Sequence, residues 1–184
     1  WWSDAAMGGG RLGANGSHQV DMLRWWLGEP ASVIGQALTI VPDRLCRDSG
    51  EPWTATADDL SHFTLEMASG ALAHVFMSGV AAANLGNETQ VFGSKGTVTL
   101  SNSDEKLFFA KAGQGFEDIT VDDPHAKLAG LNKGIWNVSV LAALQELCGA
   151  ITEARELNRG ATFVDGLRNQ MVLDAVIAST ASRK

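Results

Sequence analysis

The spacing of apolar residues changes twice along this 184-residue chain, and this change restricts the possible fold more than any other feature. In residues 15–27, side chains of one face recur every three or four positions, which predicts a helix. Residues 31–121 contain runs of strand-forming residues separated by turns. The helical repeat returns at 140–157 and at 162–178. A helix, then antiparallel strands, then two helices predict an α+β fold, an open sheet with helices on one face.

Three pairs of strands are expected, each joined by a short turn that contains glycine. A single strand at 31–41 and a polar loop at 42–56 precede them. No repeat or internal boundary is evident, so residues 1–184 are expected to form one domain. The predicted pairs are 60–67 with 71–80, 88–92 with 97–101, and 107–111 with 117–121.

Helix ends carry their own signals. Asn15 or Ser17 is expected to cap the first helix, because their side chains can accept hydrogen bonds from free amides. Thr162 and Asp165 have the spacing of a capping box and predict the start of the last helix.

The strand predicted at 71–80 is apolar at both odd and even positions. A sheet covered on one face by its own helices should instead alternate between apolar and polar residues. This pattern favours a second subunit over the other face, so a homodimer or tetramer formed through the sheet is expected. The alternative is a central strand covered by loops.

Charge and cysteine content exclude several classes of protein. The chain has 21 acidic and 14 basic residues, a net charge of −7, and no basic cluster longer than a dipeptide. Nucleic acid and anionic membranes are therefore not expected as partners. No apolar run approaches the ~18 residues of a membrane span. The two cysteines fit a reducing compartment, so a cytoplasmic location is expected.

A glycine-rich segment near the N-terminus matches the spacing G-x-G-x-x-G at Gly8, Gly10 and Gly13. No apolar strand precedes it and the following helix begins late, so dinucleotide binding is not predicted for it. The chain opens on Trp1 and Trp2 without an initiator methionine, and we expect it to be a piece of a longer polypeptide.

His18 and Asp21 are three positions apart in the first predicted helix, so both side chains project from one face. An imidazole beside a carboxylate can transfer protons near neutral pH. A surface or capping arrangement is the alternative. Zinc ligation with His62 or His74 is a further alternative, but no cluster has metal-site spacing, so no metal is expected.

Residues 8–21 read Gly-Gly-Gly-Arg-Leu-Gly-Ala-Asn-Gly-Ser-His-Gln-Val-Asp, and Trp-Leu-Gly-Glu-Pro follows at 26–30. This block resembles the start of the C-terminal domain of the Gfo/Idh/MocA family, the glucose–fructose oxidoreductase and inositol dehydrogenase family. Weaker similarities continue in the family's order through residue 179, so the resemblance spans nearly the whole chain.

The resemblance implies a full-length protein in which an N-terminal Rossmann domain binds NAD or NADP. The present domain would then supply the substrate pocket and the oligomer interface, for a sugar, a polyol or a related secondary alcohol. His18 matches the family's active-site histidine, which transfers a proton or binds the reacting hydroxyl, and Asp21 matches a carboxylate beside it. Trp2, Asp4 and Asn15 flank the same loop and are expected in the pocket wall.

Two departures from the family pattern are evident. Ala14 stands where many members have an acid, four residues before the histidine. The Glu-Lys-Pro segment, whose lysine completes the family's active site, is missing from the 184 residues. This chain alone is therefore not expected to bind NAD(P) or to transfer hydride. The alternative is a non-catalytic assembly or binding module that keeps the fold.

Overall fold

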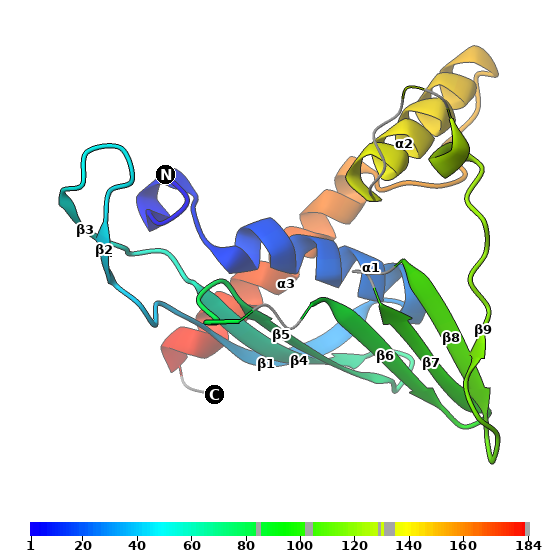
Figure 1. The fold of residues 1–184 in the computed structure, drawn as a ribbon, viewed down its shortest axis with the longest axis horizontal. Coiled ribbons are helices and arrows are strands. Elements are labelled where there is room, and N and C mark those ends of the chain that lie inside the picture. The colour runs from blue at the N-terminus through cyan, green and yellow to red at the C-terminus, as the bar shows by residue number, and fades with distance from the viewer. Residues whose placement is uncertain (84–85, 102–104, 129, 131–134, 183–184) are drawn as a thin grey trace. The chain divides into compact units, whose positions relative to one another are not determined.

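The computed structural model describes residues 1–83, 86–101, 105–128, 130 and 135–182. They form two compact units, Trp1–Ala82 with Ala161–Lys184, and Ala83–Gly160. Both units combine helices with antiparallel strands, so the expected α+β class is confirmed (Figure 1). That all 184 residues form one domain stays a prediction.

The first unit contains a three-stranded antiparallel sheet in the order β1-β4-β5. One face of this sheet is covered by two helices (Figure 1). Its elements are η1 (Ala5–Met7), η2 (Leu12–Gly16), α1 (Ser17–Leu27), β1 (Pro30–Leu38), β2 (Asp43–Leu45), β3 (Pro52–Thr54), β4 (Leu60–Met67), β5 (Leu72–Ser78) and α3 (Phe163–Ser182).

The core of this unit lies between the sheet and the two helices. Alternation along β4 turns Phe63, Leu65 and Met67 inward, and all three are fully buried. Val20 of α1 and Val176 of α3 meet them from the other side with no exposed surface. Burial of each such side chain contributes about 1.5–3 kcal/mol, so this cluster dominates the stability of the unit.

Side chains of α3 accept hydrogen bonds from β1, the edge strand of the sheet. The Gly35 amide donates to Ser179 Oγ at 3.1 Å, and the Ala37 amide donates to Thr180 Oγ1 at 2.9 Å. These two backbone donors would otherwise be left without a strand to pair with. Hydroxyl groups near the C-terminal end of α3 therefore replace the missing neighbouring strand.

The second unit contains a four-stranded meander in the order β6-β7-β8-β9. Its β6–β7 turn needs a glycine, because a Cβ on Gly96 would lie 2.5 Å from the Ala110 carbonyl oxygen. The elements are β6 (Glu88–Gly93), β7 (Gly96–Ser101), β8 (Lys106–Lys111), β9 (Glu117–Asp118), η3 (His125–Lys127) and α2 (Ile135–Thr152). All three predicted strand pairs are thereby confirmed, although β9 is shorter than expected.

Two local predictions were wrong. The polar loop expected at 42–56 contains the β2–β3 hairpin, whose strands are only three residues long and too short to show alternation. Neither Asn15 nor Ser17 caps α1, because the π-helical turn η2 runs directly into it and supplies the preceding turn. The predicted capping box of α3 is confirmed, since the Thr162 amide donates to Asp165 Oδ2 at 2.8 Å.

The outer face of the β1-β4-β5 sheet is mixed rather than uniformly apolar. Leu72 and Phe76 of β5 point outward and are 74% and 64% exposed. Their cross-strand neighbours on β4 are Glu66 and His62. The odd-numbered residues of β5 face the helices, so apolar side chains occur on both faces but form no continuous outer layer.

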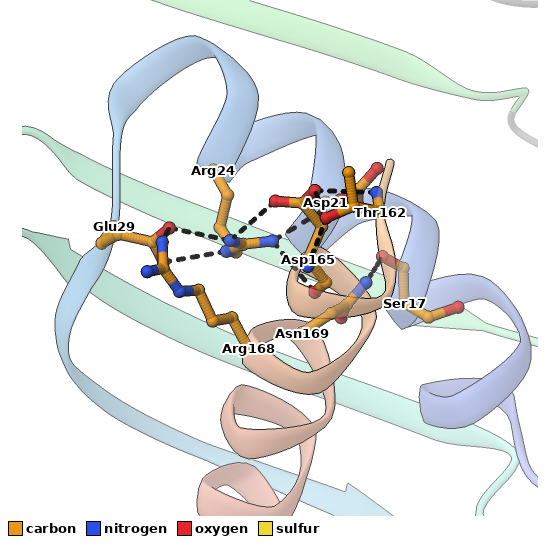
Figure 2. A network of polar contacts seen from close by, with 8 residues as sticks. All are labelled: Ser17, Asp21, Arg24, Glu29, Thr162, Asp165, Arg168 and Asn169. Carbon is orange, nitrogen blue, oxygen red and sulfur yellow. Dashed lines mark hydrogen bonds and ion pairs between the residues drawn. The ribbon is translucent and has the colours of Figure 1, made fainter. Parts of the chain in front are cut away.

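A buried arginine joins α1 to α3 (Figure 2). The Arg24 side chain is 4% exposed, and its Nε and Nη2 donate to both carboxylate oxygens of Glu29, at 2.9 and 2.7 Å. Its Nη1 donates to the Asp165 carbonyl oxygen at 3.1 Å, and its Nη2 lies 3.3 Å from Asp165 Oδ1. Arg168 donates to Glu29 as well, at 2.9 Å, but it is half exposed.

Arg24→Met should lower the free energy of unfolding by about 1.5–3 kcal/mol, because it removes charge-assisted hydrogen bonds to Glu29 and Asp165. Arg168→Met removes an exposed partner of the same Glu29 and should cost about 0–1 kcal/mol. Urea denaturation followed by circular dichroism measures both values. Equal losses in the two variants would show that burial of Arg24 does not set its importance.

The same cluster predicts acid sensitivity. A hydrogen bond from Arg24 lowers the pKa of Glu29 below its usual 4.5, and hydrogen bonds from Thr162 and then Arg24 lower the pKa of Asp165 to about 2. Both pKa values are lower in the folded state. Their stabilisation is therefore complete above the unfolded-state pKa values and is lost as the pH falls toward 2.

Denaturation midpoints measured between pH 6 and pH 2.5 should fall steeply at the acid end, and less steeply in Asp165→Asn. A variant with an unchanged slope would exclude Asp165 as a source of the acid sensitivity. Glu51→Gln, at an exposed position outside the cluster, is the matched control.

Candidate functional site

His18 is the second residue of α1 and is exposed. The chain reaches it through η2, a π-helical turn at Leu12–Gly16 that continues into α1 without a break. Single π-helical turns are rare and often occur at functional sites. The histidine thus stands on the first turn of a helix whose buried residues, Val20 and Leu23, anchor it on the sheet.

The glycine run before η2 is needed for close packing. A Cβ on Gly9 would lie 2.5 Å from the Trp1 carbonyl oxygen, and a Cβ on Gly10, at φ 125°, would collide with Asp58 Oδ1. The amide of Gly9 donates to the Asp4 carbonyl at 2.9 Å, and that of Gly10 donates to the Trp2 carbonyl at 3.1 Å. These amides are used inside the chain, so the run does not fit a dinucleotide phosphate.

Asp58 fixes the start of η2. Its Oδ2 accepts a hydrogen bond from the Leu12 amide at 2.8 Å, and its carbonyl accepts one from the Arg11 amide at 3.1 Å. Burial raises the pKa of Asp58, and these backbone amides only partly offset that effect. At the other end of η2, Asn169 of α3 donates to the Ser17 carbonyl at 2.8 Å (Figure 2).

Asp21 lies on the same helix as His18 and takes part in the Arg24 cluster. Its Oδ1 is 3.6 Å from Arg24 Nη1, and its side chain is 42% exposed. Figure 2 shows the carboxylate directed toward Arg24 and the first turn of α3. The expected pairing of Asp21 with His18 stays a prediction.

A cavity of about 380 Å³ opens in the first unit, close to the start of η2. Its lining contains Trp2 but not the other four predicted site residues. The side chain of Asp4 instead accepts a hydrogen bond from the Ala6 amide at 2.9 Å and caps η1. Asn15 Oδ1 accepts a hydrogen bond from Arg11 Nη1 at 3.4 Å. The cavity is lined by Trp2, Ser3, Gly10, Arg11, Arg44, Ala57, Asp58, Asp59 and Gly79.

Four charged residues at this cavity were not among the predicted site residues. Asp59 and Arg44 form an ion pair at 2.7 Å. Burial alone would raise the pKa of Asp59, but hydrogen bonds from two backbone amides and from Arg44 lower it below its usual value. The tandem acids at 58–59 were the available signal. Arg11 and Arg44 gave none, because sequence spacing did not show that they line one cavity with the two acids.

Among the described residues, no helix has both the length and the apolar character to cross a bilayer. Within the same residues, no three His, Cys, Asp or Glu side chains gather as metal ligands.

Known proteins support the resemblance. An uncharacterized oxidoreductase of Synechocystis sp. is 29% identical over 132 residues, covering 66% of this chain and 35% of that protein. An oxidoreductase domain protein from Kribbella flavida has a TM-score of 0.80 and 28% identity, over 95% of this chain and 50% of that one. A levoglucosan dehydrogenase in complex with NADH and L-sorbose has a TM-score of 0.79 and 23% identity, over 94% and 48%, and shows the fold alone.

The chain spans half the length of these proteins or less. The family model described as the GFO/IDH/MocA C-terminal domain matches residues 1–99, which is more than half of the chain. This chain therefore belongs to the family of GFO/IDH/MocA C-terminal domains.

Proposed function

We propose that this chain is the substrate-binding and oligomerisation domain of an NAD(P)-dependent oxidoreductase acting on a secondary alcohol. The observation that carries this proposal is the placement of His18, exposed on the first turn of α1 at the position of the family's active-site histidine. The L-sorbose in the levoglucosan dehydrogenase structure supports a sugar or polyol as the substrate class.

His18 would take the proton of the reacting hydroxyl, or return it in the reverse direction. Asp21, held 3.6 Å from Arg24, would accept a hydrogen bond from His18 or from a second substrate hydroxyl. Trp2, Asp4 and Asn15 flank this region, and of these Trp2 has the open aromatic surface that packs on a sugar ring.

The cofactor, NAD or NADP, would bind outside these 184 residues in the full-length protein. The glycine run does not fit it, because its amides already donate to chain carbonyls. The NADH in the levoglucosan dehydrogenase structure supports a nicotinamide cofactor for this protein.

A non-catalytic binding or assembly module is the second candidate. Ala14 favours it, because this position carries an acid in many family members. The two candidates differ in one measurable property, which is the dependence of turnover on His18.

His18→Asn in the full-length protein should lower kcat by roughly 10²–10⁴, because a positioned acid or base contributes about that much. His125→Asn, at a histidine that contacts Asp123 in the second unit, is the matched control and should leave kcat unchanged. Steady-state assays of NAD(P)H formation measure both. Equal, measurable rates in the two variants would exclude His18 as the acid or base, whereas absence of turnover in the parent protein would favour the non-catalytic candidate.

Assembly is proposed to use the outer face of the β1-β4-β5 sheet. Ile34, Leu72 and Phe76 are between 59% and 74% exposed on this face. Isologous pairing would cover the same patch on both subunits, and such an interface should bury more than about 1,000 Å². A homodimer, or a tetramer built from it, would result.

Light scattering at tens of micromolar protein should therefore give at least a dimer. Phe76→Glu should give a monomer, because it replaces an exposed aromatic ring of the proposed interface with a charge. Phe92→Glu, the same change at an exposed phenylalanine of β6, should stay assembled. A monomeric parent chain, or a Phe76→Glu variant that stays assembled, would contradict this interface.

A further inference from the structure

The cavity beside η2 has the size of a small-metabolite site, and its lining combines polar and apolar groups. None of its lining residues is His18 or Asp21. The cavity has two pairs of charged groups. Arg44 and Asp59 use their hydrogen bonds within the chain, whereas Arg11 and Asp58 can make further hydrogen bonds to a ligand.

Arg44 and Asp59 form the engaged pair. Besides their ion pair at 2.7 Å, Arg44 donates to Ser3 Oγ at 3.0 Å and to the Val41 carbonyl at 2.9 Å. Asp59 accepts hydrogen bonds from the Ile40 and Val41 amides at 2.7 and 3.0 Å. This pair forms a fixed wall with little capacity left for a ligand.

Arg11 is the positively charged residue of the cavity that has hydrogen-bond donors available for a ligand. Among the described residues, its guanidinium has a single side-chain partner, Asn15 Oδ1 at 3.4 Å. A guanidinium has five N–H donors in a planar fork, which matches the two oxygens of a carboxylate. Gly79 makes room for this fork, because a Cβ there would collide with Arg11 Nε.

Asp58 and Trp2 supply the other two requirements of a ligand. Asp58 Oδ2 accepts the Leu12 amide, and a carboxylate has about four lone-pair sites, so the group can also accept a hydrogen bond from a hydroxyl. The Trp2 ring is 52% exposed and offers an apolar surface to a carbon chain. The cavity thus combines a carboxylate binder, a hydroxyl acceptor and an aromatic wall.

We propose that this cavity binds a small polyhydroxylated carboxylate, with its carboxylate on Arg11, a hydroxyl on Asp58 and its carbon chain on Trp2. The site goes beyond the proposed oxidation, because it needs neither His18 nor a nicotinamide cofactor. Arg11 provides the selectivity, since a neutral polyol of the same length cannot form the charged pair.

Calorimetric titration of the 184-residue chain with D-xylonate and with xylitol tests this directly. The two probes have five carbons and differ in one terminal group. Xylonate should bind, and xylitol should bind about tenfold or more weakly, because the hydrogen bonds to Arg11 are charge-assisted. Similar affinities, or no saturable binding of xylonate, would overturn the proposal.

Substitutions at the cavity test whether xylonate binds there. Arg11→Met should weaken xylonate binding by about 10- to 100-fold, and Gly79→Ala should weaken it by displacing the guanidinium. Arg47→Met, at an exposed arginine outside the cavity, is the matched control and should have no effect. Unchanged affinity in Arg11→Met, with folding verified by circular dichroism, would overturn the assignment.

His18→Asn separates this proposal from the proposed oxidation. Xylonate affinity should be unchanged in that variant even though turnover of the full-length protein falls. Loss of xylonate binding in His18→Asn would overturn the independent site and place the ligand at the histidine instead.

Discussion

The buried guanidinium of Arg24 needs carboxylate partners to compensate its charge. One of these partners is Asp165, so the requirement fixes the position of the first turn of α3. Glu29 follows α1 directly, whereas Asp165 comes from a helix that starts more than 130 residues later. Once the first turn of α3 is held there, the rest of the helix lies along β1, where Ser179 and Thr180 accept the edge amides. The apolar core then closes between α1, α3 and the sheet.

The position of α3 also affects the proposed active site. Asn169 of α3 holds the Ser17 carbonyl, and Asp58 holds the Leu12 amide, so η2 is fixed at both ends. His18 follows immediately and is exposed on the first turn of α1. The position of His18 therefore depends on two anchors from distant parts of the chain, Asn169 and Asp58.

Local signals were sufficient for much of this fold. The hairpins, the two C-terminal helices and the Thr162–Asp165 capping box depend on residues a few positions apart, so spacing and turn chemistry predicted them. The π-helical entry to α1 and the Arg24 cluster depend on partners up to 152 residues away. The β2–β3 hairpin is local, but its three-residue strands are too short to show alternation. The family motif identified His18 and Asp21, but the cavity around Arg11 and Asp58 required the folded chain.

A structure of the full-length protein with nicotinamide cofactor and bound alcohol substrate tests the central claim most directly. Our account predicts that the His18 imidazole contacts the reacting hydroxyl and that Asp21 remains beside Arg24 on the same helix. A substrate whose reacting hydroxyl is bound elsewhere, without contact to His18, would contradict it.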